Sequence, residues 1–168
     1  MKNAIISALL AAVPAFTLAE PAPNTISGTI GGLEMDAAVW SEQSDFSGDG
    51  NSGSVSILTR PVAPDQGLGI LRIGFEGSDF MGGDIFSAEV GLSDTRAENM
   101  SEYSVERDDG LELLITRSES INGTLSISGK VQGTLTWRQL MPIVERREDA
   151  SRRLPIELEF NAVLENEY

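Results

Sequence analysis

The longest alternation of apolar and polar residues runs from Ile121 to Trp137. Its odd-numbered positions are apolar or glycine, and its even-numbered positions are all polar or charged. A period of two is typical of a β-strand with one face in the core and the other in water. A straight strand of this length would extend roughly 55 Å at about 3.3 Å per residue, which is too long for a small domain. We therefore predict a bend or break at Gly129 or Gly133.

Two segments near the start, residues 25–30 and 33–39, alternate in the same way and flank Gly31-Gly32. A two-residue loop between them would place every apolar residue of both segments on one face, and two glycines suit the tight turns of hairpins. The sequence therefore predicts a hairpin with these opposed pairs: Ile30 with Leu33, Gly28 with Met35, and Ile26 with Ala37.

The rest of the chain continues the strand pattern. Further strands are predicted at 54–59, 68–75, 85–92, 101–107, 111–115 and 154–165. The other segments are predicted as a polar loop at 41–53, a short helix at 94–100, and a long connection at 138–153 with one or two helical turns after Pro142. Short strands with frequent turns predict an all-β fold, an antiparallel β-sandwich of about 8–10 strands in one domain over 25–168, with a long insert before the last strand. The competing arrangement is a small outer-membrane β-barrel, but 6% aromatic residues are few for two interfacial girdles.

The turn before the longest alternation poses a conflict between turn chemistry and burial. Asn122-Gly123 favours a two-residue turn, which would set Leu113 opposite Gln132 and turn the two apolar faces to opposite sides of the sheet. A three-residue loop at 122–124 instead pairs residues of like polarity. Since a slip of one residue reverses every side chain, we predict that loop, with a glycine bulge. The resulting pairs are Leu111 with Leu135, Leu113 with Gly133, and Ile115 with Val131.

The start of the chain has the parts of a secretory signal peptide: Lys2, an apolar run over 4–16, and Ala19 before a Pro-rich spacer at 20–24. We predict cleavage after Ala19, with Ala15 as the alternative site. The net charge is −14, and loss of Lys2 makes it −15. Such a surface repels nucleic acid and favours solubility. We expect an exported, periplasmic or extracellular monomer.

Composition excludes much catalytic chemistry. The chain has no His and no Cys, so it has no His-dependent triad, no thiol nucleophile and no disulfide. Catalysis by carboxylates alone remains an alternative, because acids gather around one turn and glycosidases use such groups. These acids are Glu102, Glu106, Asp108, Asp109 and Glu112. A run of acids at a turn is more often a solvated edge, so we lean towards a protein that is not an enzyme.

Two further segments suggest ligand sites. Oxygen-bearing side chains alternate at Asp45, Ser47, Asp49 and Asn51, which resembles the opening of a calcium loop, although the twelfth position is Ser56 instead of Glu. A polar connection without metal is the commoner meaning of such a pattern. Trp40 falls out of register with the apolar face and is a candidate platform for a sugar ring. Together they define one alternative function, a calcium-assisted carbohydrate-binding module.

The basic residues are unevenly distributed. Five arginines gather within 16 positions of an acidic chain: Arg138, Arg146, Arg147, Arg152 and Arg153. They predict either a docking loop for an acidic partner or a polyanion, or contacts with the protein's own acids, including Glu157 and Glu159, and we favour the contacts with its own acids. We therefore expect a non-catalytic binding or structural role in the cell envelope, with a protein or glycan partner and without a resident cofactor.

Overall fold

The computed structural model describes residues 24–97, 100–140 and 147–166. The predicted leader and residues 20–23 of the spacer lie outside these ranges. The described chain forms ten strands, with three single 3₁₀ turns between them. The strands are β1 (Thr25–Ile30), β2 (Leu33–Ala38), β3 (Asp45–Gly48), β4 (Gly53–Leu58), β5 (Leu68–Asp79), β6 (Asp84–Asp94), β7 (Ser101–Glu106), β8 (Glu112–Ile121), β9 (Thr124–Gln139) and β10 (Arg147–Asn166).

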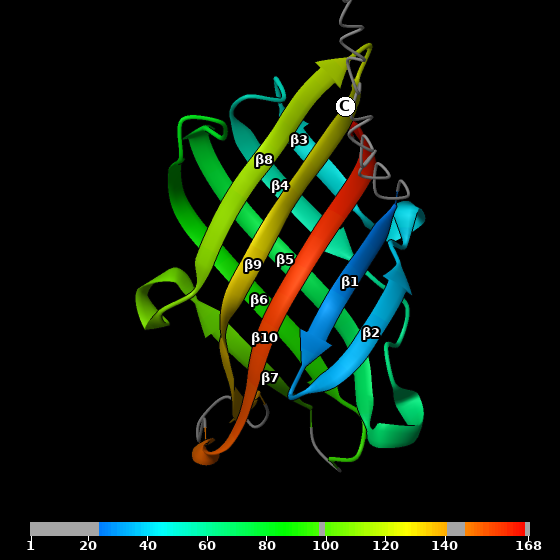
Figure 1. Cartoon of the computed structure of the whole chain (residues 1–168), viewed down its shortest axis with the longest axis vertical. Helices are drawn as coiled ribbons and strands as arrows, with labels where there is room; N and C mark the ends of the chain where they lie inside the picture. The colour runs from blue at the N-terminus through cyan, green and yellow to red at the C-terminus, as the bar shows by residue number, and fades with distance from the viewer. Residues whose placement is uncertain (1–23, 98–99, 141–146, 167–168) are drawn as a thin grey trace, which may run out of the picture.

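All ten strands belong to one sheet, in the order β2-β1-β10-β3-β4-β5-β6-β7-β9-β8. Because β10 also pairs with β9, the sheet curls round and closes on itself (Figure 1). Every pairing is antiparallel except that of β10 with β3. The all-β fold and the predicted number of strands are confirmed. Two separate facing sheets are not confirmed, since the strands are not divided between two sheets.

Strand β10 closes the sheet because it has partners on both sides. It pairs with β9 along most of its length, with β1 over Ile156–Asn161, and with β3 at Glu165 and Asn166. Its inward residues are buried, as the alternation predicts. Those residues are Ile156, Leu158, Phe160, Ala162 and Leu164.

The β1–β2 hairpin has the predicted register, with Ile30 opposite Leu33 and Ile26 opposite Ala37. Gly31 and Gly32 have φ angles of 60° and 82°, which residues with a Cβ atom rarely adopt. Turn chemistry and hydrophobic pattern agree here, and this agreement makes the register predictable.

The register predicted for the β8–β9 hairpin is wrong. A two-residue turn forms at Asn122 and Gly123, with φ angles of 53° and 82°, and Ile121 lies opposite Thr124. A β-bulge then places one extra residue, Thr116, between two paired positions. Beyond the bulge, Ile115 faces Gly129, and its side chain points inward. The bulge therefore satisfies both the turn preference and the burial of the apolar face.

Strand β9 continues through both glycines at which a bend or break was predicted. The physical role of Gly129 is to make room. A Cβ atom there would lie 2.6 Å from Cζ of Phe160 and 2.6 Å from the carbonyl oxygen of Leu114. Gly129 thus allows the Phe160 ring of β10 to approach β9 closely.

Three other segments differ from the prediction. The loop predicted at 41–53 contains strand β3, whose Phe46 is buried. No helix forms at 94–97, because Asp94 ends β6 and a turn follows; residues 98–99 lie outside the described residues. Residues 147–153 are the beginning of β10, so the connection is shorter than predicted. The helical turns predicted after Pro142 fall mostly on 141–146, which lie outside the described residues.

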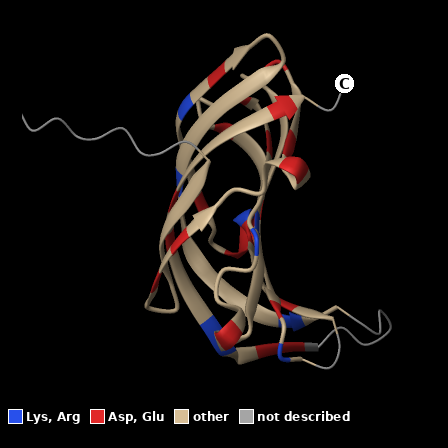
Figure 2. Ribbon diagram, turned by 90° about the vertical axis from the view of Figure 1, so that its right-hand side faces the viewer, with Lys and Arg blue, Asp and Glu red and all other residues tan. Residues whose placement is uncertain are grey.

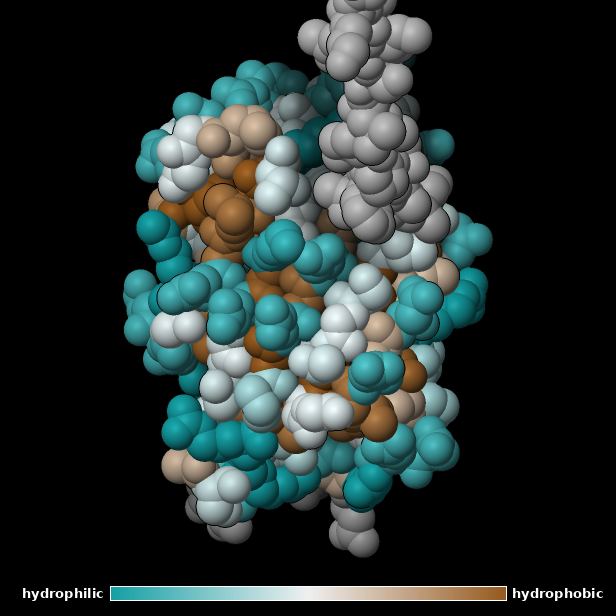
Figure 3. Space-filling view, viewed as in Figure 1, coloured by the Kyte–Doolittle hydropathy of each residue, from teal (hydrophilic) through white to brown (hydrophobic). Residues whose placement is uncertain are grey.

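Apolar side chains fill the inside of the closed sheet. Phe75 and Phe80 meet edge to face, with ring centroids 5.4 Å apart, and Phe75 also lies against Phe160. On the outer face, exposed apolar side chains include Leu114 and Ile121 of β8, and Figure 3 shows that hydrophobic surface is present on the side of the molecule that carries this strand. None of the described segments forms a helix of the length and apolarity needed to cross a membrane.

Candidate functional site

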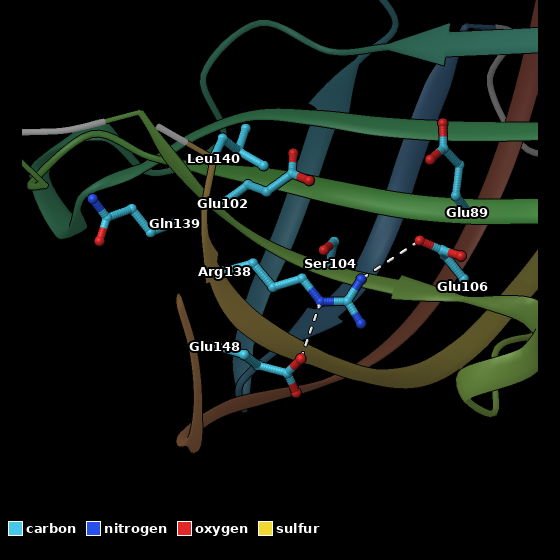
Figure 4. A pocket seen from close by; sticks show the side chains of 8 residues that line it. All are labelled: Glu89, Glu102, Ser104, Glu106, Arg138, Gln139, Leu140 and Glu148. Atoms are coloured by element: carbon cyan, nitrogen blue, oxygen red, sulfur yellow. Dashed lines mark ion pairs between the residues drawn. The ribbon is translucent and has the colours of Figure 1, made fainter. Parts of the chain in front are cut away.

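A groove of about 390 Å³ lies where β6, β7, β9 and the beginning of β10 meet (Figure 4). Four of its lining side chains are carboxylates and one is a guanidinium. The lining residues are Glu89, Glu102, Ser104, Glu106, Arg138, Gln139, Leu140 and Glu148.

Strand pairing explains why these side chains meet. Inward positions such as Leu92 and Val105 are buried in the core, so the alternating positions face outward. Gly91 pairs with Ser104, and the next outward residue of β7, Glu102, pairs with Arg138 of β9. Because Gly91 has no side chain, the Glu102 carboxylate can lie close to it: a Cβ atom at this position would be only 3.2 Å from a carboxylate oxygen of Glu102.

Arg138 is held in place by three carboxylates from different elements. Its guanidinium lies 2.8 Å from Asp109, 3.5 Å from Glu106 and 3.7 Å from Glu148. The hydrogen bond to Asp109 is the main cause that raises the pKa of Arg138. These contacts tie the turn after β7 and the beginning of β10 to β9. Arg138 therefore forms a fixed part of the groove wall.

Glu102 is the groove carboxylate with the least favourable surroundings for its charge. Burial raises the pKa of Glu102 above its ordinary value, and repulsion by Glu89 adds to this effect. Arg72 and Arg138 act in the opposite direction. Arg72 is itself engaged by Glu89, with a distance of 2.5 Å between Nη1 and Oε1. An additional cation beside Glu102 would therefore stabilise the charged form of its carboxylate.

The Ser104 hydroxyl is a buried polar group on the outward row of β7. The residue is 8% exposed, and its Oγ has no hydrogen-bond partner among the described residues. Although the hydroxyl lies close enough to Glu102 to lower that carboxyl's pKa slightly, no hydrogen bond of ordinary geometry joins them. An unpaired buried hydroxyl costs free energy. In Figure 4, Ser104 lies on the groove floor between Glu102 and Arg138.

A second polar cluster occupies the inner face at the same end of the sheet. Arg152 donates hydrogen bonds to Asp94 (2.9 Å) and to the Tyr103 hydroxyl (2.7 Å), and its guanidinium lies 4.5 Å from the centre of the Trp137 ring. The indole N–H of Trp137 also donates to Asp94. Burial alone would raise the pKa of Asp94, but hydrogen bonds from the Arg96 amide, Arg152 and Trp137 outweigh burial and lower it.

The structure separates the five predicted arginines. Arg138 lines the groove, Arg152 joins the inner cluster, and Arg153 is exposed on β10. Arg146 lies outside the described residues, and only the backbone of Arg147 is described, at the beginning of β10. Arg138 and Arg152 do contact the protein's own acids.

The acids that these two arginines contact differ from those expected. They are Glu106, Asp109, Glu148 and Asp94, and neither Glu157 nor Glu159 is among them. Glu159 instead pairs with Lys130.

The predicted calcium residues lie on β3 and in the turn that follows it. Asp45 and Ser47 lie on β3. The Asp49 carboxylate accepts hydrogen bonds from the amides of Asn51 and Ser52 and from the Ser52 hydroxyl, and these bonds lower its pKa. Among the described residues, no three acidic side chains are grouped so that they could hold a metal ion.

Trp40 is half-buried, and a guanidinium lies over one face of its ring. The Arg60 guanidinium lies 4.7 Å from the ring centre, and the indole N–H donates to Glu42 over 2.7 Å. A sugar ring stacking on Trp40 would have to use the opposite face or displace Arg60.

Sequence reasoning identified part of the groove. Arg138 was a candidate, and Glu102 and Glu106 belong to the acids singled out around one turn. Glu89 and Ser104 were missed. A usable signal for Ser104 is its place in an outward row of β7, since it follows Glu102 and precedes Glu106 at alternate positions. No such signal exists for Glu89, which reaches the groove only through the pairing of β6 with β7.

Acidic side chains outnumber basic ones over the molecule, as Figure 2 shows for one side, and the groove follows this trend. Comparison with protein-family models, with curated proteins and with solved structures found no match. The interpretation of the groove therefore rests on its own geometry and charge.

Proposed function

We propose that the chain is an exported, non-catalytic binding protein of the cell envelope, and that the groove beside Arg138 is its ligand site. The observation that carries this proposal is the Ser104 hydroxyl, which is buried, lines the groove and has no hydrogen-bond partner among the residues that the structure describes. A fold stabilised by its own contacts gains nothing from such a group, whereas a ligand would satisfy it. The leader-like residues 1–19 support export.

Binding accounts for the charged groups better than catalysis does. Glu106 and Glu148 are engaged by Arg138, and Glu89 is engaged by Arg72. These pairs hold the walls in place before a ligand arrives, and such preorganisation lowers the cost of binding. They also leave every other carboxylate of the described groove lining paired with an arginine, so none of these is available beside Glu102 as a nucleophile or base.

The proposal is tested by mapping ligands with backbone amide NMR. Small anions, neutral saccharides and small amines are titrated separately into the purified chain. We expect one class to shift the amides of Gly91 and Ser104, and to shift them less when Ser104 is changed to Val. Ser101→Ala is the matched control, because Ser101 Oγ is also buried and unpartnered but does not line the groove. Shifts confined to other surfaces, or absent for all classes, would overturn the proposal.

One observation favours a second candidate, the carboxylate-only hydrolase. A raised pKa is what a general acid needs, and Glu102 has one. Hydrolysis of aryl glycosides by the chain, lost in Glu102→Gln, would support this candidate and contradict a purely binding role. The calcium-assisted carbohydrate-binding module and a protein partner at 138–153 stay untested predictions.

A further inference from the structure

We infer that the groove takes a small organic cation with a primary ammonium group, for which Glu102 supplies the charge and Ser104 the hydrogen-bond acceptor. This inference rests on the proposed function, because it names the ligand class of the same site. The groove volume of about 390 Å³ suits a small molecule.

The charges in and around the groove favour a cation. The lining carries Glu89, Glu102, Glu106 and Glu148 against Arg138. Arg138 and the adjacent Arg72 are already paired with other carboxylates, so an anion would meet no available positive charge in the lining. Glu102 lies among these groups as a partly buried carboxylate. A cation placed there would compensate the charge that burial disfavours.

Ser104 is the second, independent observation. Its buried Oγ lacks a hydrogen-bond partner within the described part of the chain and lies next to Glu102 in the outward row of β7. A primary ammonium has three N–H donors, so one group can bond the carboxylate and the hydroxyl together. A quaternary ammonium has no donor and is usually recognised by aromatic rings, of which the groove lining has none.

A bare metal ion fits the groove less well. The described residues contain no group of three acidic side chains arranged to hold one. Hard cations such as Ca²⁺ need six to eight oxygen ligands. Leu140 also lines the groove, and its side chain offers apolar contact that an alkyl chain uses and a metal ion does not.

The inference predicts a pH dependence with a definite sign. Glu102 faces Arg72 and Glu89 from the neighbouring strands on one side and Arg138 on the other. Protonation of Glu102 removes the charge partner of the ammonium. Because burial raises the pKa of Glu102, amine affinity falls as the pH drops through that raised value, before an ordinary glutamate would protonate.

The experiment is calorimetric titration of the full chain with 1,4-diaminobutane at pH 7.5 and 0.15 M salt. We expect saturable binding, weakened at least about tenfold by Glu102→Gln, since a hydrogen bond to a charged group is lost. Ser104→Ala should weaken it several-fold, whereas Ser101→Ala should leave it unchanged. Glu165→Gln, at an exposed position outside the groove, removes the same charge and should also leave it unchanged. Tetramethylammonium should not bind.

The outcomes separate this inference from the proposed function. Equal weakening by Glu102→Gln and Glu165→Gln would mean general attraction to an acidic surface and would overturn the inference. Binding of a neutral saccharide or an anion in the groove, without amine binding, would overturn the ligand class and leave the binding role intact. Absence of any groove ligand in the NMR titrations would overturn both.

Discussion

Arg152 donates a 2.9 Å hydrogen bond to Asp94, from the first residues of the last strand to the end of the sixth. The Asp94 side chain is only 5% exposed, whereas that of Arg152 is 40% exposed. A buried carboxylate depends on its partners, while a half-exposed guanidinium retains water. The pair therefore matters to the fold chiefly through Asp94.

The first prediction follows from this asymmetry. Arg152→Met keeps the aliphatic stem but leaves Asp94 without its charge partner, and we expect the free energy of unfolding to fall by about 1.5–3 kcal/mol. Arg153→Met is the matched control, because Arg153 is exposed on the next position and its loss should cost less than about 0.5 kcal/mol. Urea unfolding measures both, and equal costs would contradict the structural role of the pair.

Asp94 also predicts acid sensitivity. Its pKa is lowered from an ordinary 3.8, so its contribution to stability is complete above the unfolded value and is lost as the pH falls through the folded value. We expect Asp94→Asn to be less stable than the parent at pH 7, with a difference that shrinks below about pH 4. The lowered pKa values of Asp49 and Asp149 cancel in this comparison, since both proteins keep these residues. A difference independent of pH would show that the charge of Asp94 is immaterial.

The contact between Gly129 and Phe160 predicts an overpacking effect. Gly129→Ala would place its Cβ atom against the ring and a backbone carbonyl, and we expect a cost of about 1–3 kcal/mol. Gly133→Ala, in the same strand and on the same face, would bring its Cβ atom no closer than 3.4 Å to a neighbour, the Leu111 side chain, and should cost less. Phe160→Leu removes the ring, and in this background Gly129→Ala should cost less free energy of unfolding than it does in the parent. A double-mutant cycle measures this difference. Strict additivity would mean that Phe160 does not impose the glycine.

The bulge predicts that one specific deletion is tolerated. Removal of Thr116 makes Ile115 and Arg117 adjacent, opposite Gly129 and Ser128, and every side chain keeps its face. We expect a change in unfolding free energy within about 1 kcal/mol. Deletion of Ser118 from the same strand would instead turn Arg117 to the inner face and should cost more. Thermal unfolding distinguishes them, and equal losses would show that the bulge itself is needed.

The sequence predicted registers where two signals agreed. In the first hairpin, the Gly31-Gly32 turn and the apolar alternation lead to the same pairs. In the second, the inward positions of β8 change from odd to even numbers at the Thr116 bulge, where Ser118 and Ser120 lie opposite buried residues of β9, and the pattern of apolar residues does not reveal this change. A shift by two residues also preserves every face, so burial could not separate the predicted pairing of Ile115 with Val131 from the observed pairing with Gly129.

The groove was predictable only in part, because residues of four strands build it. Glu102 and Glu106 are neighbours in sequence, and Arg138 belongs to an unusual cluster of basic residues. Glu89 joins them through the pairing of β6 with β7, which local pattern does not specify. The lack of a partner for Ser104 is a property of packing and has no counterpart in the sequence.

The closure of the sheet by β10 has a consequence for how the chain is made. Strands β1, β3 and β9 each depend on β10 for one of their edges. During synthesis from the amino end, the β1–β2 hairpin is made first, but the free edge of β1 is covered only after β10 has been made. Contacts so distant along the chain slow folding, and uncovered strand edges recruit other chains. We expect a chain truncated before β10 to expose all three edges and to aggregate. The 20 residues of β10 are therefore needed for the rest of the sheet to fold.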